Sequence, residues 1–235
     1  MAQFETDFSE YTTGVAPSDW TQRWNTIRYT PTVQASSLPS GTLSTKALRI
    51  VGTSDGRYAL TWDTPGSISG DVEVLCRIQH AHTTNIDQAI RTHICTSGIP
   101  SLESAYFTNF FVATSPTTVA LAEYDGGTAT NVAAAEISVA RNTWYWVRLQ
   151  KSSTTIQAKV WAHGESEPSS WSPSGSDSSL SSGSVGFGRA YSAGTLWSDF
   201  FSVGTGGDSA PSPSSILPHF ADMRGGLNND MTGGI

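Results

Sequence analysis

The stretch TWYWVRLQKSSTTIQAKVWA, residues 143–162, decides the fold class of this 235-residue chain. Polar and apolar side chains alternate on both sides of a short polar segment at residues 152–155. This pattern is typical of two antiparallel β-strands that are joined by a tight turn. The sequence therefore predicts a β-hairpin as its best-defined element.

The position of the turn also predicts which residues of the hairpin face one another. Each step away from the turn lowers the residue number on one strand by one and raises it on the other by one, so the numbers of paired residues should sum to about 307. Trp146 then lies opposite Trp161, and Arg148 lies opposite Lys159, on one face of the hairpin. The other face carries the apolar side chains around Val147, so this second face is the one predicted to join the core.

The same alternation recurs outward from the hairpin, with turn signals at roughly 8–12-residue spacing. Further strands are predicted at residues 46–51, 57–62, 71–81, 89–96, 105–113, 119–124, 132–139, 184–189 and 197–203. No segment keeps a helical apolar period for three turns, so helices longer than a single turn are not expected. The prediction is an all-β chain: a two-sheet antiparallel β-sandwich with an extended C-terminal tail.

Composition and charge exclude several classes of partner. The net charge is −7, and the 13 basic residues are scattered along the chain. Nucleic acid and anionic membranes both need a basic patch, so neither is expected as a partner. The N-terminus does not show the basic segment followed by an apolar segment that is typical of a signal peptide. No apolar run approaches the ~20 residues that span a bilayer. We therefore expect a protein that is made in a cytosol and stays off membranes.

The composition changes after residue 203. Residues 204–221 are rich in Gly, Ser and Pro and predict a linker between the sandwich at 1–203 and a tail at 222–235. The tail repeats the pattern Asp-Met-x-Gly-Gly-aliphatic. Its residues are Asp222, Met223, Gly225, Gly226, Leu227, Asp230, Met231, Gly233, Gly234 and Ile235. Two interpretations stay open: an attachment peptide with two docking units, or a disordered tail.

The polar face of the hairpin is the candidate ligand site. Trp146 and Trp161 with Arg148 and Lys159 would form an aromatic and cationic surface on a sheet, able to stack a sugar ring or hold an acidic glycan.

The two cations of this face need a neutralising group, because like charges directly opposite each other are destabilising. Glu165 or Glu167 could fold back from the following loop and supply the negative charge, or an anionic ligand could do so. The internal glutamate is the preferred interpretation, since both glutamates follow Trp161 closely.

Histidine and cysteine residues on two neighbouring predicted strands are candidates for a metal site or a disulfide. The even positions around Cys76 form the apolar face of one strand, which puts His80 and His82 on that face. On the next strand the isoleucines occupy the even-numbered positions and are expected to face the core. The odd-numbered His93 and Cys95 are therefore expected on the opposite face. Neither a zinc site nor a disulfide is therefore expected.

The last third of the chain resembles the concanavalin A-like (laminin-G-like) domains that are common in bacteriophage structural proteins. The matching pieces are TWYWVR (143–148), AKVWAHGE (158–165), EPSSW (167–171), GSVGF (183–187) and DFFSV (199–203). The opening pieces FETDF (4–8) and GVAPSDW (14–20) also resemble the start of such domains. This fold hosts lectins, glycanases and inert modules, so the resemblance is specific for the fold alone.

The resemblance implies a non-enzymatic virion protein, in several copies per particle. The leading hypothesis is an accessory receptor- or glycan-binding adhesion subunit at the tail tip or baseplate, bound to other virion proteins through its C-terminal tail. Host surface glycans are its candidate ligand. The first alternative is a capsid decoration or head-fibre protein of the same fold. The second alternative is a glycan-degrading hydrolase.

The hydrolase alternative depends on one motif at the N-terminus. Glu5, Asp7 and Glu10 spell E-x-D-x-x-E, which resembles the catalytic signature of concanavalin A-like glucanases. In those enzymes the motif lies on a central strand. Here it occupies the first strand, where Phe4 and Phe8 form the buried set and Glu5 and Asp7 face outward. Catalysis is therefore not expected.

A structural calcium ion is the one cofactor that the resemblance suggests. Asp199 matches an acidic residue on the last strand of related folds, which often helps to hold Ca²⁺ beside the first strand, where Asp7 lies. A surface aspartate without a metal is the favoured alternative.

Overall fold

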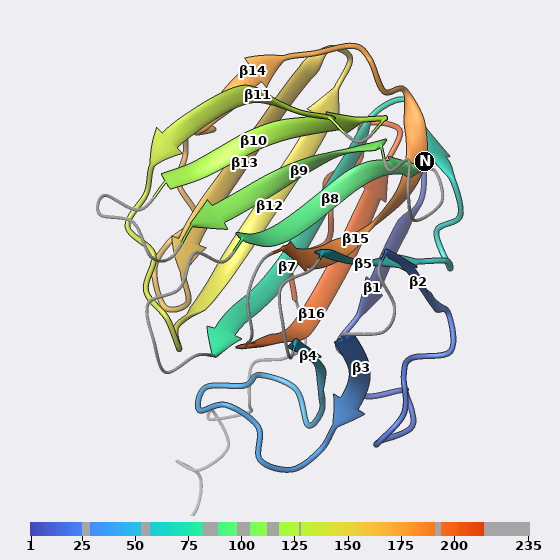
Figure 1. Ribbon diagram of the computed structural model, residues 1–235, viewed down its shortest axis with the longest axis vertical. Helices are drawn as coiled ribbons and strands as arrows, with labels where there is room; N and C mark the ends of the chain where they lie inside the picture. Colours follow the sequence, from blue (N-terminus) through green and yellow to red (C-terminus); the bar gives the residue numbers. More distant parts are fainter. Residues whose placement is uncertain are drawn as a thin grey trace, which may run out of the picture.

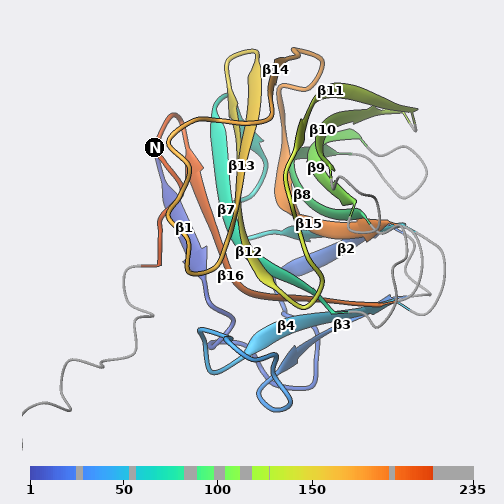
Figure 2. The same cartoon turned by 90° about the vertical axis from the view of Figure 1, so that its left-hand side faces the viewer.

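The computed structural model describes residues 1–24, 29–52, 57–81, 89–97, 104–111, 118–126, 128–190 and 194–213. These residues form two eight-stranded sheets that pack face to face, and no helix occurs among them (Figures 1 and 2). All pairings between neighbouring strands are antiparallel. The predicted all-β sandwich is confirmed.

Each sheet collects strands from distant parts of the chain. The first sheet has the order β14(Ser174–Ser176), β13(Thr155–Ala162), β12(Trp144–Ser152), β7(Val72–Ala81), β16(Gly194–Thr205), β4(Ala47–Gly52), β3(Tyr29–Gln34), and β1(Gln3–Thr6) also pairs with β16. The second sheet has the order β11(Thr128–Glu136), β10(Thr118–Asp125), β9(Ser104–Phe111), β8(Ala89–Ser97), β15(Ser182–Ala190), β5(Arg57–Trp62), β2(Trp20–Trp24), and β6(Ile68–Ser69) also pairs with β15.

The predicted strands all occur, most with ends that differ by a few residues. The prediction matches β5 residue for residue. The sequence patterns did not predict β2, β3, β6 and β14, because these strands are short or carry Pro and polar residues instead of a clear alternation.

The predicted register of the hairpin is confirmed. Trp146 pairs with Trp161, and Arg148 pairs with Lys159. Val147 and its neighbours on the other face belong to the main core between the sheets. Alternation and a short turn were enough to fix this geometry, because both act between residues close in sequence.

The central strand β7 is buried on both faces. Its even positions, around Val74 and Cys76, lie in the main core as predicted. Its odd positions, Glu73, Leu75 and Arg77, lie on the outer face of the first sheet and are buried as well. A second, smaller core therefore covers this outer face.

Part of the cover is a C-terminal strap, residues 206–213. β16 continues to Thr205, and the strap then turns back over the sheet, where Ala210 is only 3% exposed. Gly204 is needed beneath it, because a Cβ there would lie 2.2 Å from the Asp208 carbonyl oxygen. The expected linker thus begins as a packed part of the sandwich. Residues 214–221 and the repeated tail at 222–235 lie outside the described residues.

The cysteines correct one prediction about faces. Cys95 was expected opposite to the face of Cys76, yet both thiols are free and buried in the main core. A register irregularity after Ile94, with a positive φ of 55° at Cys95, turns this side chain inward. Burial raises the pKa of the Cys76 and Cys95 thiols to about 12 and about 11. His93 is buried on β8, and His82 lies outside the described residues.

Candidate functional site

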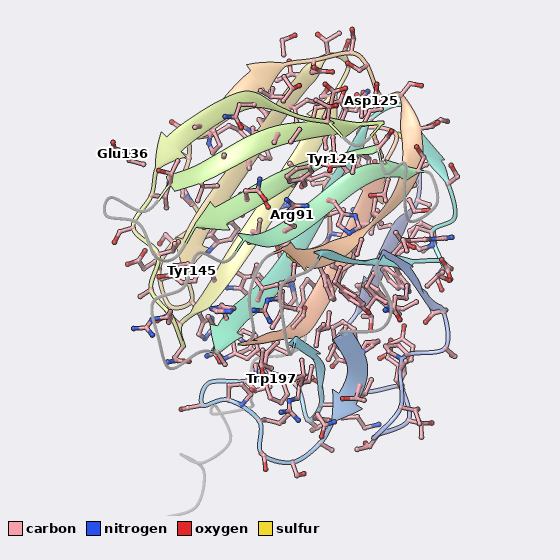
Figure 3. All side chains as sticks on the ribbon, viewed as in Figure 1. Arg91, Tyr124, Asp125, Glu136, Tyr145 and Trp197 are labelled. Carbon is pink, nitrogen blue, oxygen red and sulfur yellow. The ribbon has the colours of Figure 1, made fainter. Side chains whose placement is uncertain are left out.

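The outer face of the first sheet carries tryptophan rings interleaved with arginines. The Trp146 and Trp161 rings stack with centroids 6.3 Å apart. The Arg77 guanidinium lies 4.4 Å from the Trp144 ring and 5.8 Å from the Trp146 ring. Further along the sheet, Arg49 lies 5.6 Å from the ring of Trp197, which is labelled in Figure 3. A cation over the face of an aromatic ring is attracted to that ring electrostatically. Arginine and tryptophan side chains can therefore pack together in this layer, although it is not entirely apolar.

Asp199 is the counter-ion of this layer. Its Oδ2 accepts hydrogen bonds from Arg77 Nη1 at 2.5 Å and from the Leu43 amide at 2.7 Å, and both charged side chains are fully buried. Burial raises the pKa of Asp199 to about 6, while Arg77 and the Leu43 amide act in the opposite direction. The interpretation of Asp199 as a surface aspartate is therefore wrong, and its Oδ2 is taken up by Arg77 and the Leu43 amide.

Asp7, the other half of the suggested calcium site, hydrogen-bonds within its own turn. Asp7 follows the end of β1, and its Oδ1 accepts a hydrogen bond from the amide of Ser9 at 2.9 Å. Within the described ranges, no three His, Cys, Asp or Glu side chains come together closely enough to hold a metal ion. The donors present do not fit a calcium ion bound by Asp7 and Asp199.

The expected open tryptophan surface is a further correction. Trp146 is 8% exposed and Trp161 is 9% exposed, because the strap residue Ala210 and Phe200 pack in the same cluster. Neither ring presents a broad face for a sugar. The prediction placed them on the correct side of the sheet, but that side is covered.

Arg148 and Lys159 lie next to this cluster and are neutralised within the chain. Arg148 binds Glu73 through Nη1 and Glu167 Oε2 through Nη2, the latter at 3.1 Å. Lys159 Nζ binds Glu167 Oε1 at 3.0 Å. Burial alone would raise the pKa of Glu167, but the hydrogen bonds from Lys159 and Arg148 hold it below its ordinary value. The preferred internal neutraliser is confirmed as Glu167, with Glu73 as a second one.

A groove of about 470 Å³ opens beside these ion pairs, and we call it the Trp171 groove. The described residues that line it are Gln3, Glu73, Arg148, Lys159, Glu167, Trp171, Ser209, Ala210, Pro211 and Ser212. Its volume falls in the ~300–1,000 Å³ range of small-molecule sites. It lies outside the first sheet, between the strap and the loop at residues 163–173, which runs along the left of Figure 2.

Hydrogen bonds to β13 hold the loop that carries Trp171. The Ser172 amide donates to the Ala158 carbonyl, and the Ala158 amide donates to the Pro173 carbonyl, both at 2.9 Å. Trp171 is partly exposed, and Lys159 Nζ lies 4.8 Å from its ring centroid. Trp171, the aromatic ring among the described lining residues, is therefore held in place before any ligand arrives.

The strap builds the opposite wall of the groove. The Ala210 amide donates to Glu73 Oε1 at 3.1 Å, and Arg148 Nη1 donates to the Ala210 carbonyl at 3.3 Å. Gln3 Nε2 donates to the Ser209 carbonyl at 2.8 Å. The groove therefore combines β1 and the strap with the predicted hairpin.

The sequence interpretation missed Trp171 and Glu73 as groove residues. Trp171 had a usable signal, since it is a single tryptophan in a polar Ser- and Pro-rich loop four residues after Glu167. Glu73 had a weaker one, a carboxylate between apolar residues of a predicted central strand.

The E-x-D-x-x-E motif begins on β1, the strand whose first residue, Gln3, lines this groove. Glu5 is exposed on β1, which pairs with the C-terminal half of β16. Glu10 Oε1 accepts a hydrogen bond from the Thr6 hydroxyl at 2.5 Å, and Phe8 is buried. The motif residues do not line the groove formed by the described residues.

Comparisons with known proteins identify the fold. No protein-family profile and no curated protein sequence matches the chain. Among solved structures, carbohydrate-binding module CBM66 from Bacillus subtilis is 14% identical, with a TM-score of 0.52 over 86% of this chain and 99% of that one. Peanut lectin with a bound 9-mer peptide is 9% identical, with a TM-score of 0.54 over 86% and 96%. The fold is a lectin-like jelly roll.

No helix in the described part of the chain is long and apolar enough to cross a membrane.

A third neighbour carries calcium. The exoplasmic/lumenal domain of VIP36 in its Ca²⁺/Man2-bound form is 9% identical, with a TM-score of 0.51 over 86% of this chain and 87% of that one. These likenesses show the fold alone, because the identities are low.

Proposed function

We propose that this protein is a non-catalytic glycan-binding module whose ligand occupies the Trp171 groove. The observation that supports this is a groove of sugar-binding size that combines one fixed aromatic ring with hydrogen-bonding groups of both kinds. Similarity to CBM66 and peanut lectin adds support by analogy of fold.

The charge balance of the groove favours a neutral sugar over an acidic one. Its two cations, Arg148 and Lys159, are matched by the carboxylates of Glu73 and Glu167. The side chain of Glu167 is 33% exposed, whereas that of Lys159 is 11% exposed, so the accessible charge is negative. A carboxylate accepts hydrogen bonds from sugar hydroxyls and repels acidic substituents.

Replacing Trp171 by alanine is expected to weaken binding of a neutral glycan about tenfold. Loss of one stacked aromatic ring removes on the order of 1 kcal/mol, with the hydrophobic contact in addition. A glycan array probed with the full chain identifies the ligand, and calorimetry on the best neutral glycan measures the change. Trp171→Phe is the control and should keep most of the affinity, since it retains a flat ring. Unchanged affinity in Trp171→Ala would contradict this site.

We further propose that the module is an adhesion subunit of a bacteriophage particle, at the tail tip or baseplate or on the capsid. The sequence resemblance to phage structural proteins and the repeated C-terminal pattern support this proposal. The two Asp-Met-x-Gly-Gly-aliphatic units would act in tandem, so that the first docked unit raises the effective concentration of the second.

Deleting residues 222–235 is expected to give folded protein that no longer enters particles. The described part of the sandwich ends before this tail, and its packed strap stays intact. Incorporation is measured by immunoblot of purified particles, and immunogold labelling of wild-type particles then assigns tail or capsid. Normal incorporation of the shortened protein would mean that attachment runs through the sandwich.

A further inference from the structure

A second groove, of about 290 Å³, lies at the end of the second sheet where β8 stops and β15 begins. Figure 1 shows these two strands side by side. We call this second groove the serine groove. The described residues that line it are Arg23, Ser67, Thr96, Ser97, Ser182, Gly183 and Ser184. They come from β2, β8, β15 and the turn before β6, so the groove is distinct from the Trp171 groove on the other sheet.

The lining of the serine groove is rich in hydroxyl groups. Ser67, Ser97 and Ser182 are exposed and Ser184 is half-buried, and their hydroxyls make no side-chain hydrogen bond to the described residues, so they are open to a ligand from solvent. None of the described lining residues carries a carboxylate. Hydroxyl donors around one cation, without an anion among them, are suited to a negatively charged oxygen group.

Arg23 is the cation, and its side chain is held in place. Its Nε donates to the Thr61 hydroxyl at 2.8 Å, and its Nη2 lies 3.3 Å from Asp63 Oδ1. A guanidinium has five N–H donors, and these two contacts leave the Nη1 end for a ligand. The Arg23 and Asp63 side chains are 40% and 38% exposed, so their mutual attraction is weak and an entering anion can compete with it.

The floor of the groove is backbone without a side chain. Gly183 has φ +150°, and a Cβ there would lie 2.4 Å from the Cys95 carbonyl carbon, so no larger residue fits. Thr96 contacts His93 Nδ1 at 2.6 Å, and burial lowers the pKa of His93 to about 3, which keeps that imidazole neutral. Arg23, whose weak partner Asp63 lies outside the lining, is therefore the cation that an anion would meet among the described lining residues.

We propose that the serine groove binds an anionic oxygen group, a sulfate ester or a carboxylate, of an acidic glycan. This goes beyond the proposed function, because both the site and the ligand class differ from those of the Trp171 groove. The two grooves would give the module one site for neutral sugar and one for acidic substituents.

The test is a titration of the full chain with sodium sulfate, sodium glucuronate and glucose at matched ionic strength. Amide shifts of Thr96, Ser97 and residues 182–184 are followed by NMR. We expect saturable shifts with sulfate, glucuronate or both, weakened at least tenfold in Arg23→Gln. Asp63→Asn should strengthen binding, because it removes the competing carboxylate. Arg141→Gln, which removes an equal charge elsewhere, should change nothing.

The three ligands separate the sources of the anion. A response to sulfate alone assigns a sulfate ester, and a response to glucuronate alone assigns a carboxylate. Absence of saturation by either anion, an equal response to glucose, or binding unaffected by Arg23→Gln overturns the proposal. Trp171→Ala should leave the anion titration unchanged, so failure of the neutral-sugar site is distinguishable from failure of this one.

Discussion

Asp199→Asn is expected to lower the melting temperature by roughly 6–20 °C at pH 7.5. The substitution keeps the shape of the side chain but leaves Arg77 charged and fully buried between the rings of Trp144 and Trp146. Removing one partner of a buried ion pair costs about 3–5 kcal/mol, and each kcal/mol shifts the midpoint by about 2–4 °C in a domain of this size. Differential scanning calorimetry measures the change.

The exposed pair of Arg23 and Asp63 provides the matched control. Asp63→Asn makes the same chemical change in a pair that is 40% and 38% exposed, so a shift of no more than a few degrees is expected. Arg77→Met combined with Asp199→Leu should lose less than the sum of the two single variants, because no charge is left buried. An Asp199→Asn protein that melts within about 2 °C of the wild type would show that the pair does not hold this layer together.

Ending the chain at Thr205 is expected to lower the melting temperature by roughly 4–16 °C. The strap packs Ala210 against Trp146 and Phe200, and its removal exposes part of both rings to water. Each large apolar side chain gains about 1.5–3 kcal/mol from burial, so partial exposure of two of them costs about 2–4 kcal/mol. Removal also takes the Ala210 amide from Glu73.

A chain that ends at Pro213 separates the strap from the tail. It keeps every described strap residue and should melt like the full chain, and its tryptophan fluorescence should match as well. The chain that ends at Thr205 should show a red-shifted tryptophan emission, because the Trp146 ring becomes more exposed to water. If both shortened chains melt alike, the strap contributes nothing to stability and residues 204–221 are a simple linker, as the composition suggested.

The sequence was most informative where structure is local. The register of the hairpin follows from alternation and a short turn, because the partners are separated by few residues and a one-residue slip would turn the apolar set outward. The core face of β7, around Val74, followed in the same way. The strand β2 and the inward turn of Cys95 were not predicted, since edge strands and bulges break the period on which such arguments depend.

The candidate site was predicted in part. Arg148 and Lys159 do line a groove, and a glutamate of the following loop does neutralise them. Trp146 and Trp161 are on the predicted side but are buried, and the aromatic ring at the groove is Trp171. Alternation assigns a side chain to a face of a sheet, but it does not say whether another segment covers that face.

By itself, the sequence determined the all-β class, the hairpin pairing and the side of the sheet on which the tryptophans and cations lie. Tertiary structure alone decided what covers that side: a strap that follows β16, a loop whose Leu43 amide binds Asp199, and the pairing of Asp199 with Arg77, 122 residues away. The reason is physical. Strand pairing across a short turn is set by neighbours in the chain, whereas burial of an outer face depends on contacts between distant segments, and these carry no periodic signal.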